Sequence, residues 1–187
     1  MADYDNFYTT ENLFGEPYTE LIEFFKNYES KGKLIDVGCG QGRDAIPLAK
    51  LGYDVTGIDN SRIGIDQMLN NNEKLNLTGF VADIYKFDDY QNFDIVLLDS
   101  MFHFEKRDRK KEIELVVKIA TKIKKGSLIC ICIQDTSSKV KILKETIKNT
   151  KLDFKVLNDS SLIYNYEDKE TGHKSETNYV MYIVKKI

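Results

Sequence analysis

The fold of this chain is decided by residues 33–44, which read KLIDVGCGQGRD. A short apolar run carrying one acid passes into three alternating glycines, and a helical pattern follows. This order predicts a buried parallel strand, a tight loop and a helix start, with backbone N–H groups directed towards a ligand. A second apolar run, residues 53–58, ends at Asp59. A carboxylate at that point is placed to accept hydrogen bonds from a ribose diol, so the two segments predict a nucleoside site.

Strand and helix patterns alternate along most of the chain. Apolar residues at helical spacing predict helices over residues 17–28, 43–51, 61–72 and 107–124, and one more that Ser137 or Ser138 can cap. Strands are predicted over residues 33–37, 53–58, 78–82, 93–98 and 127–133. The tail is β-like over residues 152–156, 162–166 and 178–184, with a turn at 168–173. The alternation predicts an α/β fold with a parallel sheet, and the tail predicts an antiparallel edge.

Length and composition limit the class of protein. At 187 residues the chain suits one domain, with residues 1–30 as an N-terminal helical segment and 31–187 as the core. It has neither an apolar run of 18 residues nor a secretory signal, and its three cysteines do not suggest a disulfide framework. We therefore expect a cytoplasmic protein without membrane attachment.

The net charge of −3 is unevenly spread along the chain. Residues 1–100 hold 8 Lys and Arg against 18 Asp and Glu, whereas residues 101–187 hold 19 against 12. Solvated lysine-rich helix faces are the favoured explanation of the basic second half. A nucleic-acid partner is the alternative, but the basic run 106–111 lacks the interleaved aromatic residues of a stacking surface.

Acids recur where the predicted strands end. Asp59, Asp83 and Asp99 each lie within one residue of a strand end, and Asp36 lies just before the glycine loop. In an open parallel sheet, ligands bind beyond the carboxyl ends of the strands, so these acids are expected to line one rim. Each acid alone could be a turn or capping residue, but together they favour a binding site.

The glycine loop differs from that of a nicotinamide dinucleotide site. Such a site has the pattern G-x-G-x-x-G beneath a pyrophosphate, whereas here the pattern is Asp36-x-Gly38-x-Gly40-x-Gly42, and Arg43 follows. An acid two residues before the first glycine is unfavourable for an anion and favourable for a cation. A sulfonium-linked amino acid, with its ammonium group and positive sulfur, suits these carboxylates and glycine carbonyls.

The stretch from Leu34 to Gly42 resembles the first signature motif of the class I S-adenosylmethionine-dependent methyltransferases. Asp59, Asp83 and Asp99 match the acids that end the second, third and fourth strands in that family. The resemblance covers about residues 30–135. It implies a Rossmann-like three-layer sandwich, with a seven-stranded, mostly parallel sheet and an antiparallel C-terminal strand. Residues 42–45 and 51–55 are similar to the tellurite-resistance and thiopurine branch of small-molecule methyltransferases.

The resemblance also implies roles for single residues. Asp36 would act near the methionine amino group, Asp59 would take both ribose hydroxyls, and Asp83 would accept from the adenine amino group with Ile84 packed on the ring. Cys39 is expected to serve in packing. The implied cofactor-binding residues are Asp36, Gly38, Cys39, Gly40, Gly42, Asp59, Asn60, Asp83, Ile84 and Asp99.

Two residues are candidates for a base that deprotonates the acceptor. His103 follows the fourth strand by a few residues, between Phe102 and Phe104, and Asp99 is the alternative. A histidine satisfied within a packed loop is the competing interpretation of His103. His173 falls in the presumed turn and is expected to be solvated. No set of metal ligands is evident.

The resemblance therefore implies an S-adenosyl-L-methionine-dependent methyltransferase that acts on a small molecule by direct displacement. An RNA or protein methyltransferase that uses the basic second half stays open, as does a non-catalytic sensor or partner subunit that binds the cofactor. A hydride-transfer enzyme is a more distant alternative. Residues 1–16 are expected either to cover the site as a lid or to pack on the sheet edge. The acceptor is not readable from the sequence, and both a monomer and a homodimer are compatible with it.

Overall fold

The computed structural model describes residues 5, 8–10, 12–167, 172 and 174–187. His173 and Phe7, and most of the turn predicted at 168–173, lie outside the described residues. In chain order the elements are α1 (Thr19–Asn27), β1 (Lys33–Val37), α2 (Ala45–Lys50), β2 (Asp54–Asp59), α3 (Arg62–Leu69), β3 (Leu77–Val81), the 3-10 turn η2 (Tyr90–Asn92), β4 (Ile95–Asp99), α4 (Arg109–Lys122), β5 (Leu128–Gln134), α5 (Ser137–Asn149), β6 (Phe154–Glu167) and β7 (Lys174–Lys186).

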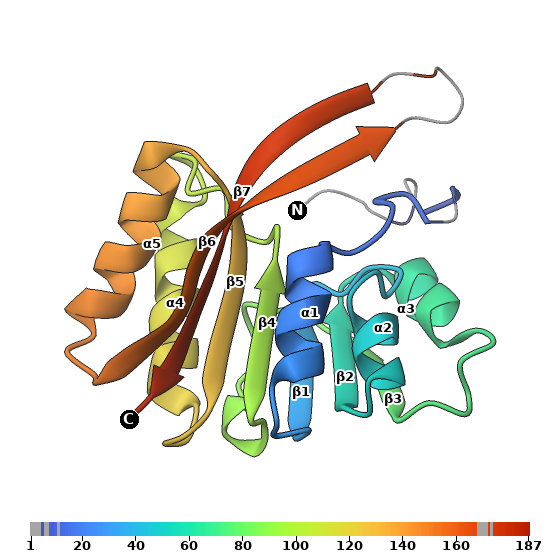
Figure 1. Cartoon of the computed structure of the whole chain (residues 1–187), viewed down its shortest axis with the longest axis horizontal. Helices are drawn as coiled ribbons and strands as arrows, with labels where there is room; N and C mark the ends of the chain where they lie inside the picture. Colours follow the sequence, from blue (N-terminus) through green and yellow to red (C-terminus); the bar gives the residue numbers. More distant parts are fainter. Residues whose placement is uncertain (1–4, 6–7, 11, 168–171, 173) are drawn as a thin grey trace.

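The described strands form one seven-stranded sheet in the order β3-β2-β1-β4-β5-β7-β6 (Figure 1). β1 pairs in parallel with both β2 and β4, and β7 is inserted antiparallel between β5 and β6. The mostly parallel sheet with an antiparallel last strand is therefore confirmed. Because the strand order reverses between β1 and β4, the loops after these two strands diverge and leave a crevice at their carboxyl ends.

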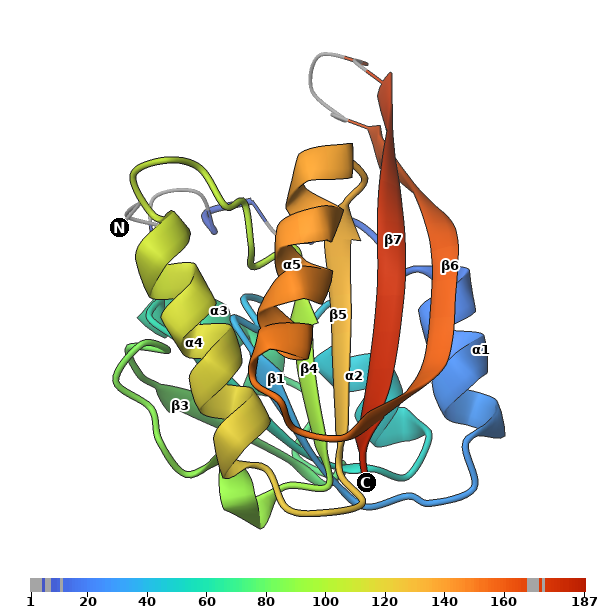
Figure 2. The same cartoon turned by 90° about the vertical axis from the view of Figure 1, so that its left-hand side faces the viewer.

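Helices cover both faces of the sheet, which makes three layers (Figures 1 and 2). Successive side chains of a strand point to opposite faces. In β5, Ile129, Ile131 and Ile133 join the core beneath α4 and α5, whereas Cys130 and Cys132 join the core beneath α1, α2 and α3. This double burial explains why the sequence of β5 is continuously apolar instead of alternating.

The β6–β7 hairpin extends past the rest of the sheet (Figures 1 and 2). β5 pairs with β7 only as far as Tyr179, but the two hairpin strands continue to pair out to Glu167 and Lys174. β6 is one continuous strand with an irregularity between Val156 and Asn158, so the two separate tail segments predicted at 152–156 and 162–166 are wrong. The extra residue between Val156 and Asn158 bends the strand, so the side chains before and after it do not follow one continuous alternation along the sequence.

Most element boundaries were predicted within two or three residues. Ser61 caps α3 as predicted, because its Oγ accepts a hydrogen bond of 3.0 Å from the Gly64 amide. The cap of α5 is Thr136, whose Oγ1 accepts from the Lys139 amide at 3.3 Å, so the prediction of Ser137 or Ser138 is wrong by one residue. All these residues are hydroxyl-bearing, and the helix phase alone does not choose between them.

Several lysines of the basic second half have structural contacts. Lys186 Nζ donates to the carbonyls of Ala120, Thr121 and Ile123 at the end of α4, at 2.8–3.0 Å. Lys118 Nζ donates to the carbonyls of Tyr85 and Phe87 at 2.7 and 3.0 Å. A cation at a helix C-terminus stabilises the carbonyls that lack a partner there. Part of the basic charge therefore stabilises the fold. Among the described residues, no helix has the length and apolar character needed to cross a bilayer.

Candidate active site

The glycine loop follows β1 at the carboxyl edge of the sheet. Gly38, Gly40 and Gly42 have φ angles of 79°, 52° and 85°, a backbone region that residues other than glycine rarely adopt. A Cβ on Gly40 would stand 2.5 Å from the Tyr8 hydroxyl, and one on Gly38 would overlap the Met101 thioether. Space and conformation thus both require glycine, because Tyr8 and Met101 pack directly against the backbone of the loop.

Gly64 explains an apparent weakness of α3. A glycine within a helix costs about 1 kcal/mol relative to alanine. Here a Cβ at position 64 would lie 3.0 Å from the Gly40 backbone and 3.0 Å from the Tyr8 ring. The helix therefore gives up intrinsic stability so that the glycine loop can pack against it.

Asp59, the last residue of β2, is tied to the loop. Its two carboxylate oxygens accept from the Gly40 amide at 3.0 Å and from the Ser61 amide at 2.8 Å. Burial raises the pKa of Asp59, and the backbone hydrogen bonds oppose that rise by stabilising its charged form. Asn60 and Ile84 lie with Asp59 on the lining of one cavity.

Three carboxylates and one guanidinium are buried where β1, the glycine loop and β4 meet. Asp36 is 2 % exposed, Asp44 5 % and Asp99 8 %. The Arg43 guanidinium donates to Asp99 Oδ2, and to Asp44 Oδ2 at 3.2 Å. Asp36 Oδ2 and Asp44 Oδ1 are buried without a hydrogen-bond partner among the described residues. Carboxyl groups therefore outnumber cationic groups here, and two of their oxygens are left to accept from a cationic ligand.

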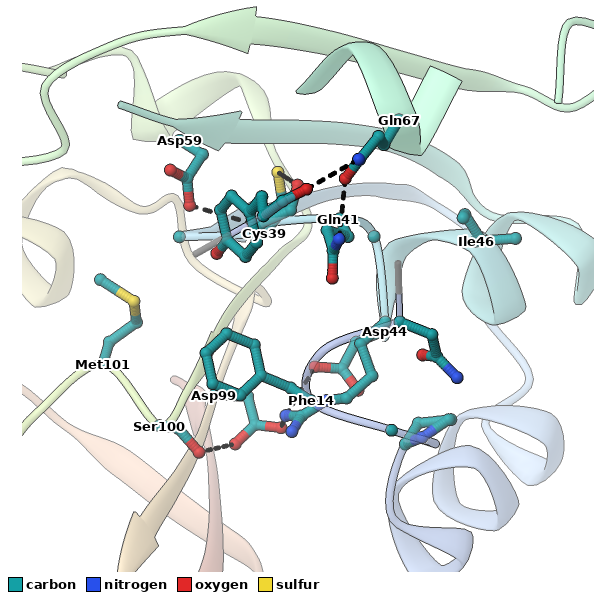
Figure 3. Close-up of a pocket in the computed structure, with 18 of the residues that line it drawn as sticks. Phe14, Cys39, Gln41, Asp44, Ile46, Asp59, Gln67, Asp99, Ser100 and Met101 are labelled. Atoms are coloured by element: carbon teal, nitrogen blue, oxygen red, sulfur yellow. Dashed lines mark hydrogen bonds and ion pairs between the residues drawn. The ribbon is translucent and has the colours of Figure 1, made fainter. Parts of the chain in front are cut away.

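The loop after β4 carries the two candidate bases. Both oxygens of Asp99 are engaged, since Ser100 Oγ donates to Oδ1 at 2.9 Å and Arg43 contacts Oδ2. The His103 side chain is exposed on the cavity lining. Glu112, which is 3 % exposed, holds this loop because its oxygens accept from the amides of His103 at 3.3 Å and Phe104 at 2.6 Å. Figure 3 shows Asp99, Ser100 and Met101 on this side of the cavity.

Asp83 lies apart from the other strand-end acids. It does not line the cavity, and its Oδ1 accepts from the Tyr85 amide two residues later, at 3.0 Å. Asp36 also lies behind the lining and does not form part of it. The structure thus gathers the glycines, Cys39, Asp59, Asn60, Ile84, Asp99 and His103 around one cavity and leaves Asp36 and Asp83 just outside its surface.

Residues 8–10 and 12–17, which we call the N-terminal strap, cross the glycine loop. Gln41 Nε2 donates to the Thr10 carbonyl at 2.8 Å, and Gln41 Oε1 accepts from the Leu13 amide at 2.9 Å. Gln67 on α3 donates to the Tyr8 carbonyl at 2.9 Å and accepts from Gln41 at 2.7 Å. Gln41 and Gln67 thus hold the strap against the loop (Figure 3).

The cavity has a volume of about 830 Å³. Its lining includes Gly38, Gly40 and Asp59, and it also includes the aromatic residues Phe14, Tyr164 and Tyr179. Small-molecule sites are typically about 300–1,000 Å³, so the volume suits small molecules. Within the part of the chain that the structure describes, no three His, Cys, Asp or Glu side chains gather in a way that could hold a metal ion.

Three comparisons with known proteins agree with this geometry. A family model described as a methyltransferase domain matches residues 28–186. TehB of Haemophilus influenzae, named as a probable S-adenosyl-L-methionine-dependent methyltransferase, is 37% identical over 79 residues, which are 41% of this chain and 28% of that protein. A ubiquinone biosynthesis O-methyltransferase of Rickettsia typhi is 26% identical over 196 residues, 90% of this chain and 79% of that protein. The crystal structure of the Haemophilus TehB superimposes with a TM-score of 0.73 at 20% identity, covering 98% of this chain and 66% of that one.

The fold and the matching domain define a class I S-adenosyl-L-methionine-dependent methyltransferase, with the Rossmann-like arrangement implied by the sequence resemblance. The chain belongs to this methyltransferase family, and part of it is similar in sequence to TehB. The aligned stretch spans little more than a quarter of the TehB relative, 28% of its length.

The site fits the cofactor of this family. The glycine loop lines the cavity, Asp59 accepts from its Gly40 amide, and buried carboxylate oxygens without partners lie behind it. These features suit a ligand that joins a ribose to a positively charged amino-acid part.

Several residues of the site were not found from the sequence. Gln41, Glu112, Tyr164 and Tyr179 are not singled out by the sequence, and Arg43 stands out only as a departure from a dinucleotide motif and as part of the stretch 42–45 that resembles one methyltransferase branch. Glu112 stands beside the basic run 106–111 and looks like a surface charge until its burial is seen. The lid hypothesis for residues 1–16 pointed to the strap, but not to the glutamines that hold it.

Asp59→Asn should weaken the binding of S-adenosylhomocysteine by about tenfold or more. The asparagine must turn an N–H₂ group towards one of the amides that Asp59 now accepts from, which leaves a donor unpaired and shifts the loop. Calorimetric titration measures the effect. Asp54→Asn, an exposed acid at the other end of β2, is the matched control and should leave affinity unchanged. Equal affinities of both variants and the parent protein would mean that the nucleoside lies elsewhere.

The stability of the ligand-free protein should fall as the pH rises from about 5 to 8. Burial and then repulsion from Asp44 raise the pKa of Asp99 to about 8, whereas an unfolded aspartate titrates near pH 4. The folded state therefore holds more protons than the unfolded state in this window, and the free energy of unfolding falls by up to about 1.4 kcal/mol per pH unit for each such proton.

Urea unfolding at pH 5, 6.5 and 8 measures this slope, and Asp99→Asn should reduce it, leaving the part that comes from Asp36, whose pKa burial also raises well above its usual value. Asp94→Asn at the start of β4 is the control. Partial burial would raise the pKa of Asp94, but hydrogen bonds from Lys124 and the Lys33 amide hold it below its usual value. That variant should lower stability without changing the slope above pH 5. A parent protein whose stability rises with pH across this window would contradict the prediction.

Proposed function

We propose that this protein transfers a methyl group from S-adenosyl-L-methionine to a small-molecule acceptor by direct displacement. The observation that carries the proposal is that one cavity is lined both by the glycine loop with Asp59 and by the aromatic side chains of Phe14, Tyr164 and Tyr179. Such an arrangement brings a nucleoside site and an aromatic pocket together. The protein's task is then to align the two reactants and exclude water.

The residues that would hold the cofactor lie along β1, β2 and the segment after β3. S-adenosyl-L-methionine, when bound, supplies a methyl group on a positively charged sulfur. The backbone at Gly38, Cys39, Gly40 and Gly42 would contact it, and Asp59 with Asn60 would bind the ribose. Ile84, which is 7 % exposed on the cavity lining, would pack on the adenine ring. Asp83 would accept from the adenine amino group at the margin of the cavity. Asp36 would bind the ammonium group of the methionine part, in part through water.

A small acceptor is favoured by what surrounds the opening. The N-terminal strap crosses the site, and Phe14, Tyr164 and Tyr179 give the cavity an aromatic lining. The relatives named as ubiquinone biosynthesis O-methyltransferases support an acceptor of this kind. The RNA or protein alternative loses support because Lys118 and Lys186 of the basic half are bound to backbone carbonyls.

His103 is the favoured proton acceptor. Its side chain lies exposed on the cavity lining and makes no hydrogen bond to another described side chain. Asp99 is less suited to this task because Arg43 and Ser100 occupy both of its oxygens. An acceptor that is already a strong nucleophile would need neither residue.

We also place the protein in the reducing cytoplasm. Cys39, Cys130 and Cys132 are free and buried. Burial raises the pKa of the Cys39 thiol well above its usual value, which keeps it unreactive. Cysteines of this kind behave as small apolar residues and need no oxidising compartment.

S-adenosylhomocysteine should bind this protein, and a nicotinamide dinucleotide should not. The acids near the glycine loop repel a pyrophosphate and attract an ammonium group. Calorimetric titration with both ligands separates the methyltransferase from a hydride-transfer enzyme. A panel of small thiols, phenols and amines, assayed for S-adenosylhomocysteine release, then separates an enzyme from a binding protein. Tight binding without turnover on any acceptor would favour the non-catalytic sensor.

We further propose that residues 1–16 act as a lid. Gln41 in the glycine loop contacts the strap directly, so the same loop would contact both the strap and a bound nucleoside. Removing residues 1–16 should speed the dissociation of S-adenosylhomocysteine by about tenfold or more, with a much smaller loss of folding stability. Stopped-flow dissociation and thermal unfolding measure the two effects.

A point variant tests the lid without truncation. Gln67→Ala removes the contacts to Tyr8 and Gln41 and should also speed dissociation. Gln91→Ala is the control, because Gln91 is exposed in a distant turn, where its side chain donates to Asp89. If the truncated protein and Gln67→Ala release the ligand at the parent rate, the strap is ordinary packing.

A further inference from the structure

Arg43 contacts three parts of the chain that are distant in sequence. Its guanidinium donates to Asp99 at the end of β4 and, at 3.2 Å, to the neighbouring Asp44. The guanidinium carbon lies 5.4 Å from the ring centre of Tyr18, which caps α1, and 5.8 Å from that of Tyr164 on β6. One side chain thus links the glycine loop to β4, to the start of α1 and to the hairpin.

The contacts use the particular shape of arginine. Two carboxylates meet the N–H edge of the guanidinium, and aromatic rings lie near it at cation–π distance. Lysine carries the same charge but has neither a planar fork nor a flat face. The site therefore depends on the geometry of Arg43 as well as on its charge.

Three tyrosines are grouped beside Arg43; two of them line the cavity and the third, Tyr18, is buried and not part of the lining. The ring centres of Tyr18, Tyr164 and Tyr179 lie 5.7–6.0 Å from one another. Tyr164 also donates from its hydroxyl to the Phe14 carbonyl of the N-terminal strap, at 3.1 Å. Both Tyr164 and Tyr179 line the cavity. We call these three tyrosines the tyrosine wall.

Stability alone does not account for Arg43. Although burial by itself would lower the pKa of Arg43, Asp44 and Asp99 hold that pKa above its usual value, so the group stays charged. A buried ion pair is often no more stabilising than apolar side chains of similar volume. Among the described residues, no other cationic side chain contacts Asp44 or Asp99. Arg43 stands on the cavity lining, between the carboxylates of Asp44 and Asp99 and the tyrosine wall.

We propose that Arg43 is a positioning residue for the transfer reaction: it holds Asp99 in place and fixes the tyrosine wall, against which the acceptor lies. This inference rests on the proposed function, since it assigns the hairpin to the acceptor side of the same site. The hairpin needs such a support because its outer part lies beyond the end of β5. There, β6 and β7 pair only with each other among the described strands. Through Arg43, a change in the position of the glycine loop on ligand binding then reaches the hairpin.

The test compares Arg43→Lys and Arg43→Met with the parent protein. Amide hydrogen exchange, followed by mass spectrometry, should be about tenfold faster in both variants over residues 162–167 and 174–180, without ligand. S-adenosylhomocysteine should slow exchange in the hairpin of the parent protein. It should still bind both variants, with affinity within about fivefold of the parent, but no longer slow that exchange.

Kinetics with any acceptor found in the panel supply a second measurement. The kcat should fall by about tenfold or more in both variants, while the KM for S-adenosylmethionine changes by less than about threefold. Arg62→Lys, an exposed arginine at the start of α3, is the matched control and should behave as the parent protein. Thermal unfolding of each variant shows whether it is folded before the other measurements are interpreted.

Two outcomes would overturn the proposal. Parent-like hairpin exchange in Arg43→Lys would mean that any cation suffices and that the planar shape of the guanidinium has no role. A loss of S-adenosylhomocysteine affinity as large as the loss of kcat would make Arg43 a cofactor contact instead. If the parent protein fails to bind S-adenosylhomocysteine, the proposed function fails by itself. The exchange measured without ligand then still decides whether Arg43 holds the hairpin.

Discussion

The reversal of strand order between β1 and β4 is the constraint on which this site depends. Both strands run parallel side by side, but the chain leaves their carboxyl ends in opposite directions, so no connection fills the space between the two loops. That space receives the glycine loop from one side and residues 99–104 from the other. Gly38 could not carry a side chain because Met101 of the second loop already stands there. The crevice is thus a consequence of topology, and side chains from later segments only line it.

The parts of this arrangement that are local in sequence could be predicted from it. Strand β1, the glycine loop and Asp59 lie within 27 residues, and each has a pattern that follows from backbone geometry: an apolar run, positive φ angles, an acid at a strand end. The antiparallel tail was also predictable in outline, because its strands alternate. Its exact continuity was not, because the irregularity after Val156 moves the alternation by one residue and makes one strand read as two.

The parts that were missed depend on contacts distant in sequence. Gln41 looks like a spacer between glycines until residues 10 and 13 come to lie beside it. Glu112 looks like one charge in a basic helix, although its carboxylate holds the amides of a loop eight and nine residues earlier. Arg43 and Tyr164 lie more than a hundred residues apart. A single sequence contains no periodicity that joins such pairs, so only the folded chain reveals them.

The excess of buried carboxyl groups over cations connects the stability of the site to its ligand. Among the described residues, Arg43 is the one cation that pairs with Asp44 and Asp99, and burial raises the pKa of Asp36 well above its usual value. Without a ligand, the folded protein therefore keeps protons on part of this cluster. A cationic ligand supplies the missing charge, so its binding and the release of these protons are thermodynamically linked. The same carboxylates that cost folding stability therefore favour a positively charged cofactor over a neutral or anionic one.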